Sequence, residues 1–390
     1  MCLYPRLIRN PRYKDTGKYG AKPRDPRMVS VPIGCGVCKE CLDQKRNNWL
    51  IRLQEDIQYG GLKGYMVTLT FSEEAITKLQ SEFETGEDTT GNDIAKLAVK
   101  RFLERWRKKY KKSIKHWLIT EHGHINTERI HLHGVLFTDI NILKGCENKI
   151  EDWGVLSKKC ELAQRWMYGQ VHVGKYCNAK TINYIIKYVT KRDKDHPGYV
   201  PKILCSPGIG KTYTQRSDFK RHVYRGKDTE TRYKLKDGRQ IGLPIYYRNK
   251  AWTPMQREDL WMITLDKNER WVLGVKIDIS RGEQEYYKRL EHAQKINLEL
   301  GYASPEEWRV QRYRARREEQ GLAIKTGEMI ISNLNACNYE EIIYTFEDHI
   351  TKKQRIEREK EDEQWRKVLY KWNASPPLFE FKLNDCIAPF

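Results

Sequence analysis

Ile130-His131-Leu132-His133-Gly134-Val135-Leu136-Phe137 is the stretch of sequence that decides how the rest of the chain is interpreted. Its apolar, β-branched and aromatic residues predict a strand, and successive side chains of a strand point to opposite faces of the sheet. The imidazoles of His131 and His133 therefore share one face, and Leu132 points to the core. Two imidazoles on one face form half of a metal site. The alternative is that these histidines only form hydrogen bonds at a strand end.

A divalent ion needs further ligands, and the sequence offers two candidates. A second strand is predicted from His116 to Glu121, and the carboxylate of Glu121 could complete the site. His122 competes with it, because the sequence does not fix which face of that strand is exposed. Two imidazoles and a carboxylate suit Mn²⁺ or Zn²⁺, and they accept Mg²⁺ when a substrate phosphate completes the shell. The spacing alone is not specific, because His122-Gly123-His124 repeats it.

A helix predicted from about Lys180 to Arg192 carries the second chemical feature. On a 3.6-residue period one side is an apolar stripe, formed by Ile182, Ile185, Ile186 and Val189. The nearly opposite side holds Tyr184, Lys187, Tyr188 and Lys191. Because the apolar stripe supplies the core contact, the two tyrosines are expected to be displayed. A phenol becomes a nucleophile only beside a cation or a neutralised phosphate, and Lys187 is predicted to assist. Ordinary surface aromatics on a basic helix are the alternative.

A metal half-site followed by Tyr-x-x-Lys-Tyr describes a nuclease that forms a phosphotyrosine. A metal ion polarises the scissile phosphate, and a tyrosine displaces the 3′ oxygen to leave a 5′-phosphotyrosine and a free 3′-OH. A second tyrosine permits a second cleavage while the first adduct persists. We predict Tyr184 as the first nucleophile and Tyr188 as the second, with the reverse order open.

Three motifs occur in a family-specific order: Thr68-Leu69-Thr70-Phe71, then His131-Leu132-His133, then Tyr184-Ile185-Ile186-Lys187-Tyr188. This order resembles the HUH rolling-circle replication initiators. The opening Met1-Cys2-Leu3-Tyr4-Pro5, a cysteine cluster at residues 35–41 and Pro207-Gly208-Ile209-Gly210 narrow the resemblance to the replication initiation proteins of gokushovirus-type microviruses, small phages with circular single-stranded DNA. The resemblance covers roughly residues 1 to 215.

The resemblance implies an α+β fold with a central antiparallel sheet of about five strands and helices. His131 and His133 would lie on a central strand, the tyrosines on a facing helix, and Glu121 would be the acidic ligand of a Mg or Mn ion. Many members have Pro where Ile130 stands and Gly where Thr120 stands, and the residue at His122 is often aromatic. These departures leave the third ligand open.

The implied activity is rolling-circle initiation by a site-specific single-strand endonuclease that also joins strands. The implied partner is viral origin DNA, either single-stranded or supercoiled duplex, in the cytoplasm of a bacterial host. Host helicase and polymerase are further partners that the resemblance allows. The alternatives are an HUH transposase or plasmid initiator, and a non-catalytic zinc-containing protein that binds nucleic acid.

The charge balance agrees with a polyanionic partner. The 390 residues include 72 Lys and Arg against 52 Asp and Glu, a net charge of +20, which favours nucleic acid over a neutral metabolite. No apolar run is long enough to span a membrane, and the first ten residues lack a signal-peptide core, so we expect a soluble intracellular protein with no membrane partner. The basic residues predicted to contact DNA are Lys191, Arg192, Lys211, Arg101 and Arg105. Lys211 ends a sequence similar to a P-loop, but Cys205 stands where that motif needs glycine.

The cysteine cluster has a chemistry of its own. Cys35, Cys38 and Cys41 present three thiols in one short segment, and a fourth ligand would complete a tetrahedral zinc site. Cys2 is the predicted fourth ligand. Free thiols and an iron–sulfur cluster are the alternatives.

Four regions are expected along the chain. They are a basic arm with the cysteine cluster and a helix (1–60), an HUH-type endonuclease domain (61–225), an accessory β region (226–280) and a helical, charged C-terminal region (281–390). The accessory region has hairpin signals at Lys236-Asp237-Gly238 and at Asp266-Lys267-Asn268. The last region has helical patterns at 282–320 and 350–371.

Overall fold

The computed structural model describes residues 2–13, 23–83, 90–123, 129–145, 149–151, 154–157, 160–174, 176–193 and 195–319. By its internal contacts the chain divides into two compact units. In the described part, one unit combines the N-terminal residues up to 41 with residues 264–313, and the other spans residues 42–263. The helical pattern at 350–371 lies outside the described residues.

The unit of residues 42–263 is built on one antiparallel sheet of seven strands in the order β6-β7-β8-β3-β5-β4-β9. In chain order the strands are β3 (Lys63–Leu69), β4 (Lys115–His122), β5 (Ile130–Thr138), β6 (Lys149–Glu151), β7 (Gly154–Ser157), β8 (Val171–Gly174) and β9 (Ile203–Cys205). The five strands β8-β3-β5-β4-β9 confirm the predicted α+β class with its central antiparallel sheet, and β6 and β7 extend that sheet at one edge.

Strand β5 lies in the middle of this sheet, paired with β3 on one side and with β4 on the other. His133 is opposite Thr68 of β3 and Ile119 of β4, and His131 is opposite Glu121 of β4. A Cβ at Gly134 would lie 2.0 Å from the carbonyl oxygen of Trp117, so the strand pairing leaves no room for a side chain at this position. The glycine that follows the histidine pair is thus required by the close approach of β4.

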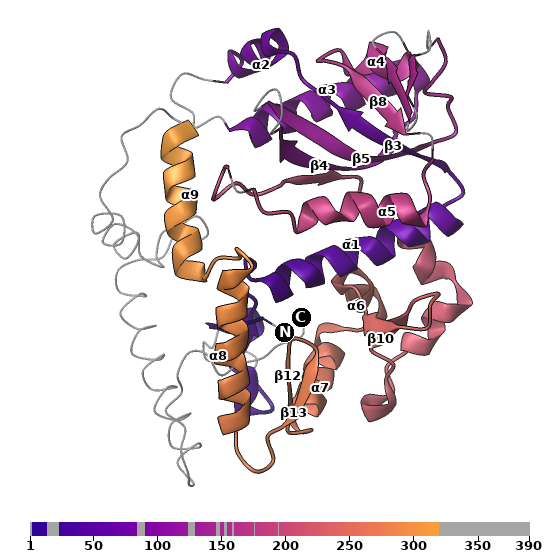
Figure 1. The fold of residues 1–390 in the computed structure, drawn as a ribbon. Helices are drawn as coiled ribbons and strands as arrows, with labels where there is room; N and C mark the ends of the chain where they lie inside the picture. The colour runs from indigo at the N-terminus through magenta and orange to yellow at the C-terminus, as the bar shows by residue number, and fades with distance from the viewer. Residues whose placement is uncertain are drawn as a thin grey trace, which may run out of the picture. The chain divides into compact units, whose positions relative to one another are not determined.

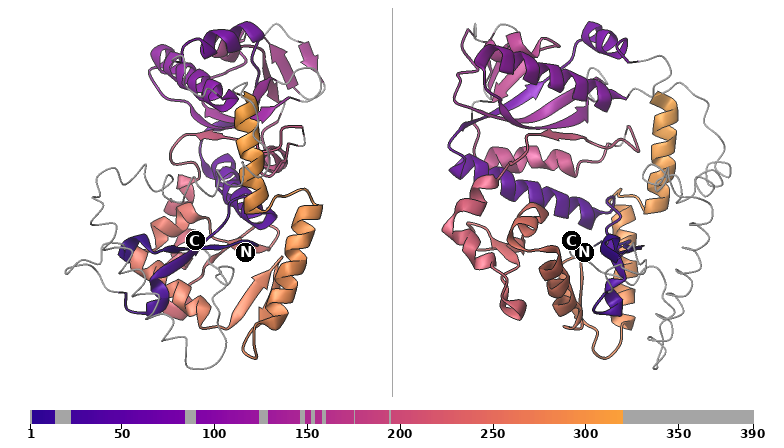
Figure 2. Two further views of the ribbon diagram at one scale, coloured as in Figure 1. Left: turned by 90° about the vertical axis from the view of Figure 1, so that its left-hand side faces the viewer. Right: turned by 180° about the vertical axis from the view of Figure 1, so that it is seen from behind.

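Helices cover both faces of the sheet, as Figures 1 and 2 show. One face carries Leu132 and Leu136 and packs against α3 (Gly91–Tyr110) and α4 (Glu161–Trp166). The other face carries Val135 and Phe137 and packs against α5 (Ala179–Ile185) and α1 (Lys39–Tyr59). The short helix α2 (Glu73–Gln80) follows β3. Burying one large apolar side chain stabilises such a fold by about 1.5–3 kcal/mol.

Two buried acidic side chains fix the position of α1 in this unit. Asp56 forms an ion pair of 2.7 Å with Lys115 of β4, and Glu55 forms one of 2.9 Å with Arg216 and accepts a hydrogen bond from Tyr233. The two carboxylates thus join α1 to the sheet and to the segment after it. Removing one partner of a buried pair typically costs about 3–5 kcal/mol, because a charge is left without compensation.

The segment after the sheet combines short strands, helices and many buried aromatic side chains. It contains β10 (Arg232–Lys234), β11 (Gln240–Gly242), α6 (Ile245–Ala251) and α7 (Pro254–Leu265). The hairpin predicted at Lys236-Asp237-Gly238 is confirmed, because that turn joins β10 to β11. The hairpin predicted at Asp266-Lys267-Asn268 is wrong in position: this turn follows α7, and the hairpin turn is Leu273-Gly274. Both turn residues have positive φ, 47° and 80°, a conformation that leucine rarely adopts, so the residue types there do not signal a turn.

The unit of residues up to 41 and 264–313 has two small antiparallel hairpins. They pair β1 (Arg6–Arg9) with β2 (Ser30–Ile33), and β12 (Glu269–Val272) with β13 (Val275–Asp278). Helix α8 (Gln284–Glu299) packs beside β12 in a small core that also holds Leu3 and Cys38 (Figure 1). Helix α9 (Pro305–Glu319) follows. No helix among the described residues combines the length and the apolar character needed to cross a membrane.

Candidate functional site

The tyrosine segment begins with a well-formed helix cap. The side chain of Asn178 accepts hydrogen bonds from the backbone N–H groups of Lys180 (2.9 Å) and Thr181 (3.2 Å), which satisfies two donors that a helix start leaves open. The helix is shorter than predicted. α5 continues as a 3₁₀ helix, η3 (Ile186–Val189), and ends there because the hydroxyl of Thr190 donates to the carbonyl of Lys187 and competes with helix continuation.

The two stripes of this segment confirm the predicted sidedness. The apolar stripe is buried against β4 and β5: Ile182, Ile185, Ile186 and Val189. Tyr184 is 49% exposed, Tyr188 is half-buried, and Lys187 and Lys191 are exposed. The tyrosines therefore do not contribute to the core.

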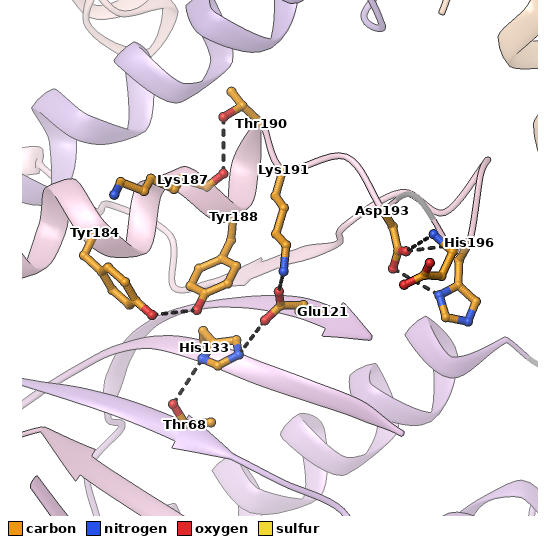
Figure 3. Close-up of polar contacts among 11 residues, drawn as sticks. Thr68, Glu121, His133, Tyr184, Lys187, Tyr188, Thr190, Lys191, Asp193 and His196 are labelled. Atoms are coloured by element: carbon orange, nitrogen blue, oxygen red, sulfur yellow. Dashed lines mark hydrogen bonds and ion pairs between the residues drawn. The ribbon is translucent and has the colours of Figure 1, made fainter. Parts of the chain in front are cut away.

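Tyr188 lies directly on one of the two histidines (Figure 3). Its ring stacks on the imidazole of His133 with a centroid distance of 4.4 Å and an angle of 6°. Its hydroxyl is 3.2 Å from the hydroxyl of Tyr184, whose ring is perpendicular to it. Burial, the hydrogen bond with Tyr184 and the negative charge of Glu121 raise the pKa of Tyr188. The helix and the central strand thus meet at one polar cluster.

Glu121 connects this cluster to β4. Its Oε2 is 2.8 Å from Nε2 of His133, and its Oε1 accepts an ion-pair hydrogen bond from the ammonium of Lys191. Burial opposes ionisation of Glu121, but the hydrogen bonds from His133 and Lys191 outweigh it and lower the pKa of this carboxyl. Glu121 is therefore an ionised ligand held between two cationic or proton-donating groups.

The imidazoles are set up to act as ligands. His131 and His133 share a face, with ring centroids 6.4 Å apart. Burial, followed by the like charge of His133, lowers the pKa of His131 and favours the neutral ring that binds metals. Nδ1 of His133 lies 3.1 Å from the hydroxyl of Thr68. A hydroxyl can donate or accept, so Thr68 supports His133 in either tautomer.

Thr68 was not among the predicted site residues, although it belongs to the Thr68-Leu69-Thr70-Phe71 motif. Strand alternation places it on the face of His133, opposite it in register. The signal in the sequence was a threonine that alternates with the buried residues Val67 and Leu69, but only the pairing of β3 with β5 identified its partner.

The two candidates for the third ligand lie on different faces of β4. Glu121 is on the face of the tyrosines, whereas His122 pairs with Ile130, which belongs to the core under α3. The ring of His122 stacks on His196 at a centroid distance of 4.7 Å and meets the ring of Tyr199 edge-on. Geometry therefore favours Glu121.

The predicted DNA-contacting residues fall in different places. Lys191 lies at the site, and Arg192 follows it; Lys211 begins the 3₁₀ helix η4 (Lys211–Gln215) and is exposed. Arg101 and Arg105 belong to α3, which covers the other face of the sheet.

The side chain of Arg105 donates to the carbonyl oxygens of Arg165 and Trp166 and to the hydroxyl of Tyr168, and Arg101 pairs with Glu82. Their predicted contribution beside the tyrosines is therefore wrong in position. The basic density of α3 gave no indication of which face of the sheet the helix covers.

The four predicted zinc ligands come together in the other unit. The Sγ atoms of Cys2, Cys35, Cys38 and Cys41 all lie within 4.8 Å of one another. This is the only group of at least three potential ligands that meets this distance among the residues described. The cluster could bind a metal such as zinc.

Comparison with known proteins adds one finding. Residues 64–193 match the family model of the replication-associated protein ORF2, and this range includes the three strands and the tyrosine segment of the polar cluster. Neither curated proteins nor solved structures give a match. The family match is limited to one part of the chain, and it supports a replication initiator protein with nucleic acid as its partner.

Proposed function

We propose that this chain initiates rolling-circle replication of a circular single-stranded phage genome by cutting and rejoining one DNA strand through a tyrosyl ester. The observation that carries the proposal is the stacking of Tyr188 on His133, with the hydroxyl of Tyr184 3.2 Å from that of Tyr188 and Glu121 on the same histidine. A purely structural role would not require a carboxylate, an imidazole, two phenols and a lysine in one partly exposed cluster.

In this proposal His131, His133 and Glu121 hold a divalent ion, Mg²⁺ or Mn²⁺. The donor set fits, because it offers two imidazoles and an ionised carboxylate on one face, and the Nε2 of His133 and Oε2 of Glu121 already point toward each other. When bound, the ion supplies Lewis-acid polarisation of the scissile phosphate. The alternatives for the histidine pair then reduce to this role or to the hydrogen bonds seen with Thr68 and Glu121.

The attacking group is a phenol oxygen of Tyr184 or Tyr188. A bond from this oxygen to phosphorus forms as the P–O3′ bond breaks, the phenol proton is released, and the leaving 3′ oxygen takes up a proton. We assign the first cut to Tyr184, because it is more exposed and burial and Glu121 keep the proton on Tyr188. Tyr188 then serves the second cut, while the first adduct persists.

Two lysines accompany the two phenols. The ammonium of Lys187 lies 5.8 Å from the ring centre of Tyr184, and that of Lys191 lies 5.9 Å from the ring centre of Tyr188. In the proposal each lysine neutralises a DNA phosphate beside its tyrosine. Lys187, Lys191, Arg192 and Lys211 form the DNA-contacting set.

The test uses the full chain, Mn²⁺ and a pool of single-stranded oligonucleotides of random sequence. With a label at the 3′ end we expect labelled DNA that stays with the protein through denaturation, and with a label at the 5′ end we expect only shortened free DNA ending in 3′-OH. Tyr184→Phe and Tyr188→Phe each retain some adduct, and the double variant has none. Tyr176→Phe, an exposed tyrosine before α5, is the matched control.

An adduct in the double variant refutes the assignment of the tyrosines. DNA binding without any adduct, in wild type and control alike, indicates the non-catalytic alternative. A transposase would join the cut strand to a new target, whereas an initiator releases closed circles from a substrate with two copies of the cut sequence. A phage genome as the substrate and a location in the cytoplasm of a bacterial host belong to this proposal as well.

A further inference from the structure

The cysteine cluster contains the geometry of a complete metal site. The Sγ atoms of Cys35 and Cys41 are 4.0 Å apart, as are those of Cys2 and Cys38. Four sulfurs around zinc at about 2.3 Å would be about 3.8 Å from each other. A disulfide needs about 2 Å, so these sulfurs are free thiols arranged at the spacing of tetrahedral ligands.

The backbone around the cluster is shaped for sulfur ligands. N–H groups of Leu3, Tyr4, Cys35 and Cys38 donate to the sulfurs over 3.2 to 3.5 Å, which stabilises negative charge on thiolates. A Cβ at Gly34 would lie 2.9 Å from the Sγ of Cys41, and Gly36 has a φ of 78°. The two glycines thus allow the chain to turn closely around the sulfurs.

The cluster lies at the junction of two distant parts of the chain. Leu3 is 1% exposed, and its carbonyl accepts a hydrogen bond of 2.7 Å from Gln294 on α8, which is 291 residues away in sequence. The N–H of Lys39 donates over 2.9 Å to the side chain of Asn297, which is 1% exposed. Closing a loop of this length is entropically costly, and a few hydrogen bonds contribute only about 1 kcal/mol each.

The apolar core at this junction is small. In the described part of this unit it holds seven buried side chains: Leu3, Cys38, Val272, Ile277, Tyr286, Leu290 and Ala293. A core of this size rarely stabilises a fold without a metal or a covalent link. A bound structural zinc ion contributes roughly 10–16 kcal/mol of binding energy in small zinc-dependent folds.

We propose that Cys2, Cys35, Cys38 and Cys41 bind one structural zinc ion, and that this ion holds the N-terminal segment against the β12–β13 hairpin and α8. The zinc is required for the order of this unit, whereas the sheet of residues 42–263 keeps its fold without it. This inference is independent of the proposed nuclease chemistry, since it involves neither the histidines nor the tyrosines.

The first test is elemental analysis of the full chain purified under reducing conditions. We expect one zinc per chain that is lost in Cys38→Ser, the most buried ligand. It is retained in Cys160→Ser, a control cysteine that is equally buried under the sheet, and in His133→Ala, which alters the candidate active site. Iron in place of zinc, or zinc retained by Cys38→Ser, overturns the proposal.

The second test needs no variant and therefore holds even if Cys38→Ser fails to fold. Zinc is removed from the wild-type chain with a chelator, and amide hydrogen exchange is compared before and after. Exchange is expected to accelerate at least about tenfold in residues 2–13, 29–41 and 284–299 and to stay unchanged in α3 and β5. Unchanged protection of α8 and of the N-terminal residues after removal contradicts the proposal.

Discussion

The two ligand clusters of this molecule differ in what fills the space between their donor atoms. The four cysteines face only one another, within 4.8 Å, so the set is complete once a single ion enters. In the cluster of His131, His133 and Glu121, the carboxylate is already bound to His133 and to Lys191. The first arrangement is typical of structural sites, and the second is typical of sites that must remain open to a substrate.

The comparison teaches that polar partners can substitute for a metal ion in an open site. Lys191 brings a positive charge to Glu121, and Thr68 supports His133 from the other side. A closed cysteine site has no such substitute, because four thiols cannot compensate one another's charge. We therefore expect the two clusters to respond differently to substitution.

The largest effect is expected for His133→Ala. This change removes a proposed ligand and the ring on which Tyr188 stacks, so adduct formation should fall about 10³-fold, equivalent to about 4 kcal/mol of transition-state stabilisation. Zinc content and the unfolding transition should be nearly unchanged. Adduct formation within tenfold of wild type would show that the histidines are structural.

A smaller loss is expected for Thr68→Val, which keeps the shape of the side chain and removes its hydroxyl. His133 then lacks its partner at Nδ1, and the affinity for Mn²⁺ should fall about 10- to 100-fold. Titration of adduct formation with Mn²⁺ measures this directly. Thr77→Val, on the exposed surface of α2, is the matched control, and equal behaviour of the two variants contradicts the role of Thr68.

Lys191→Met tests whether lysine competes with the metal for Glu121. Without the ammonium, Mn²⁺ binding in the absence of DNA should tighten several-fold, because no positive charge has to be displaced from the carboxylate. Lys187→Met should leave Mn²⁺ binding unchanged, since Lys187 lies near Tyr184. Weaker Mn²⁺ binding in Lys191→Met argues against this competition and for a direct supporting role.

The smallest effect is expected for Arg101→Ala. Arg101 pairs with Glu82 at the surface of α3, on the face of the sheet away from the tyrosines, and exposed pairs contribute about 0–1 kcal/mol. Adduct formation and its salt dependence should stay within about twofold of wild type. A clear reduction in the salt dependence indicates that DNA also follows the α3 face.

Local patterns predicted much of the fold and of the site. Strand alternation placed His131 and His133 on one face, and helical period separated the tyrosines from the apolar stripe, because both depend only on backbone geometry within one segment. The same patterns misplaced Arg105. Its basic neighbours on α3 indicate a charged surface, but its hydrogen bonds to Arg165, Trp166 and Tyr168 come from a segment about 60 residues away.

By itself, the sequence determined which residue types share a face of each strand and helix, the spacing of the cysteines and the positive charge of the whole chain. Only the tertiary structure decided between Glu121 and His122, brought Thr68 and Lys191 to the histidine site and joined Cys2 to the other cysteines. The physical reason is that side-chain periodicity is a local property of the backbone, whereas strand pairing and the packing of helices on a given face depend on contacts between segments far apart in the chain.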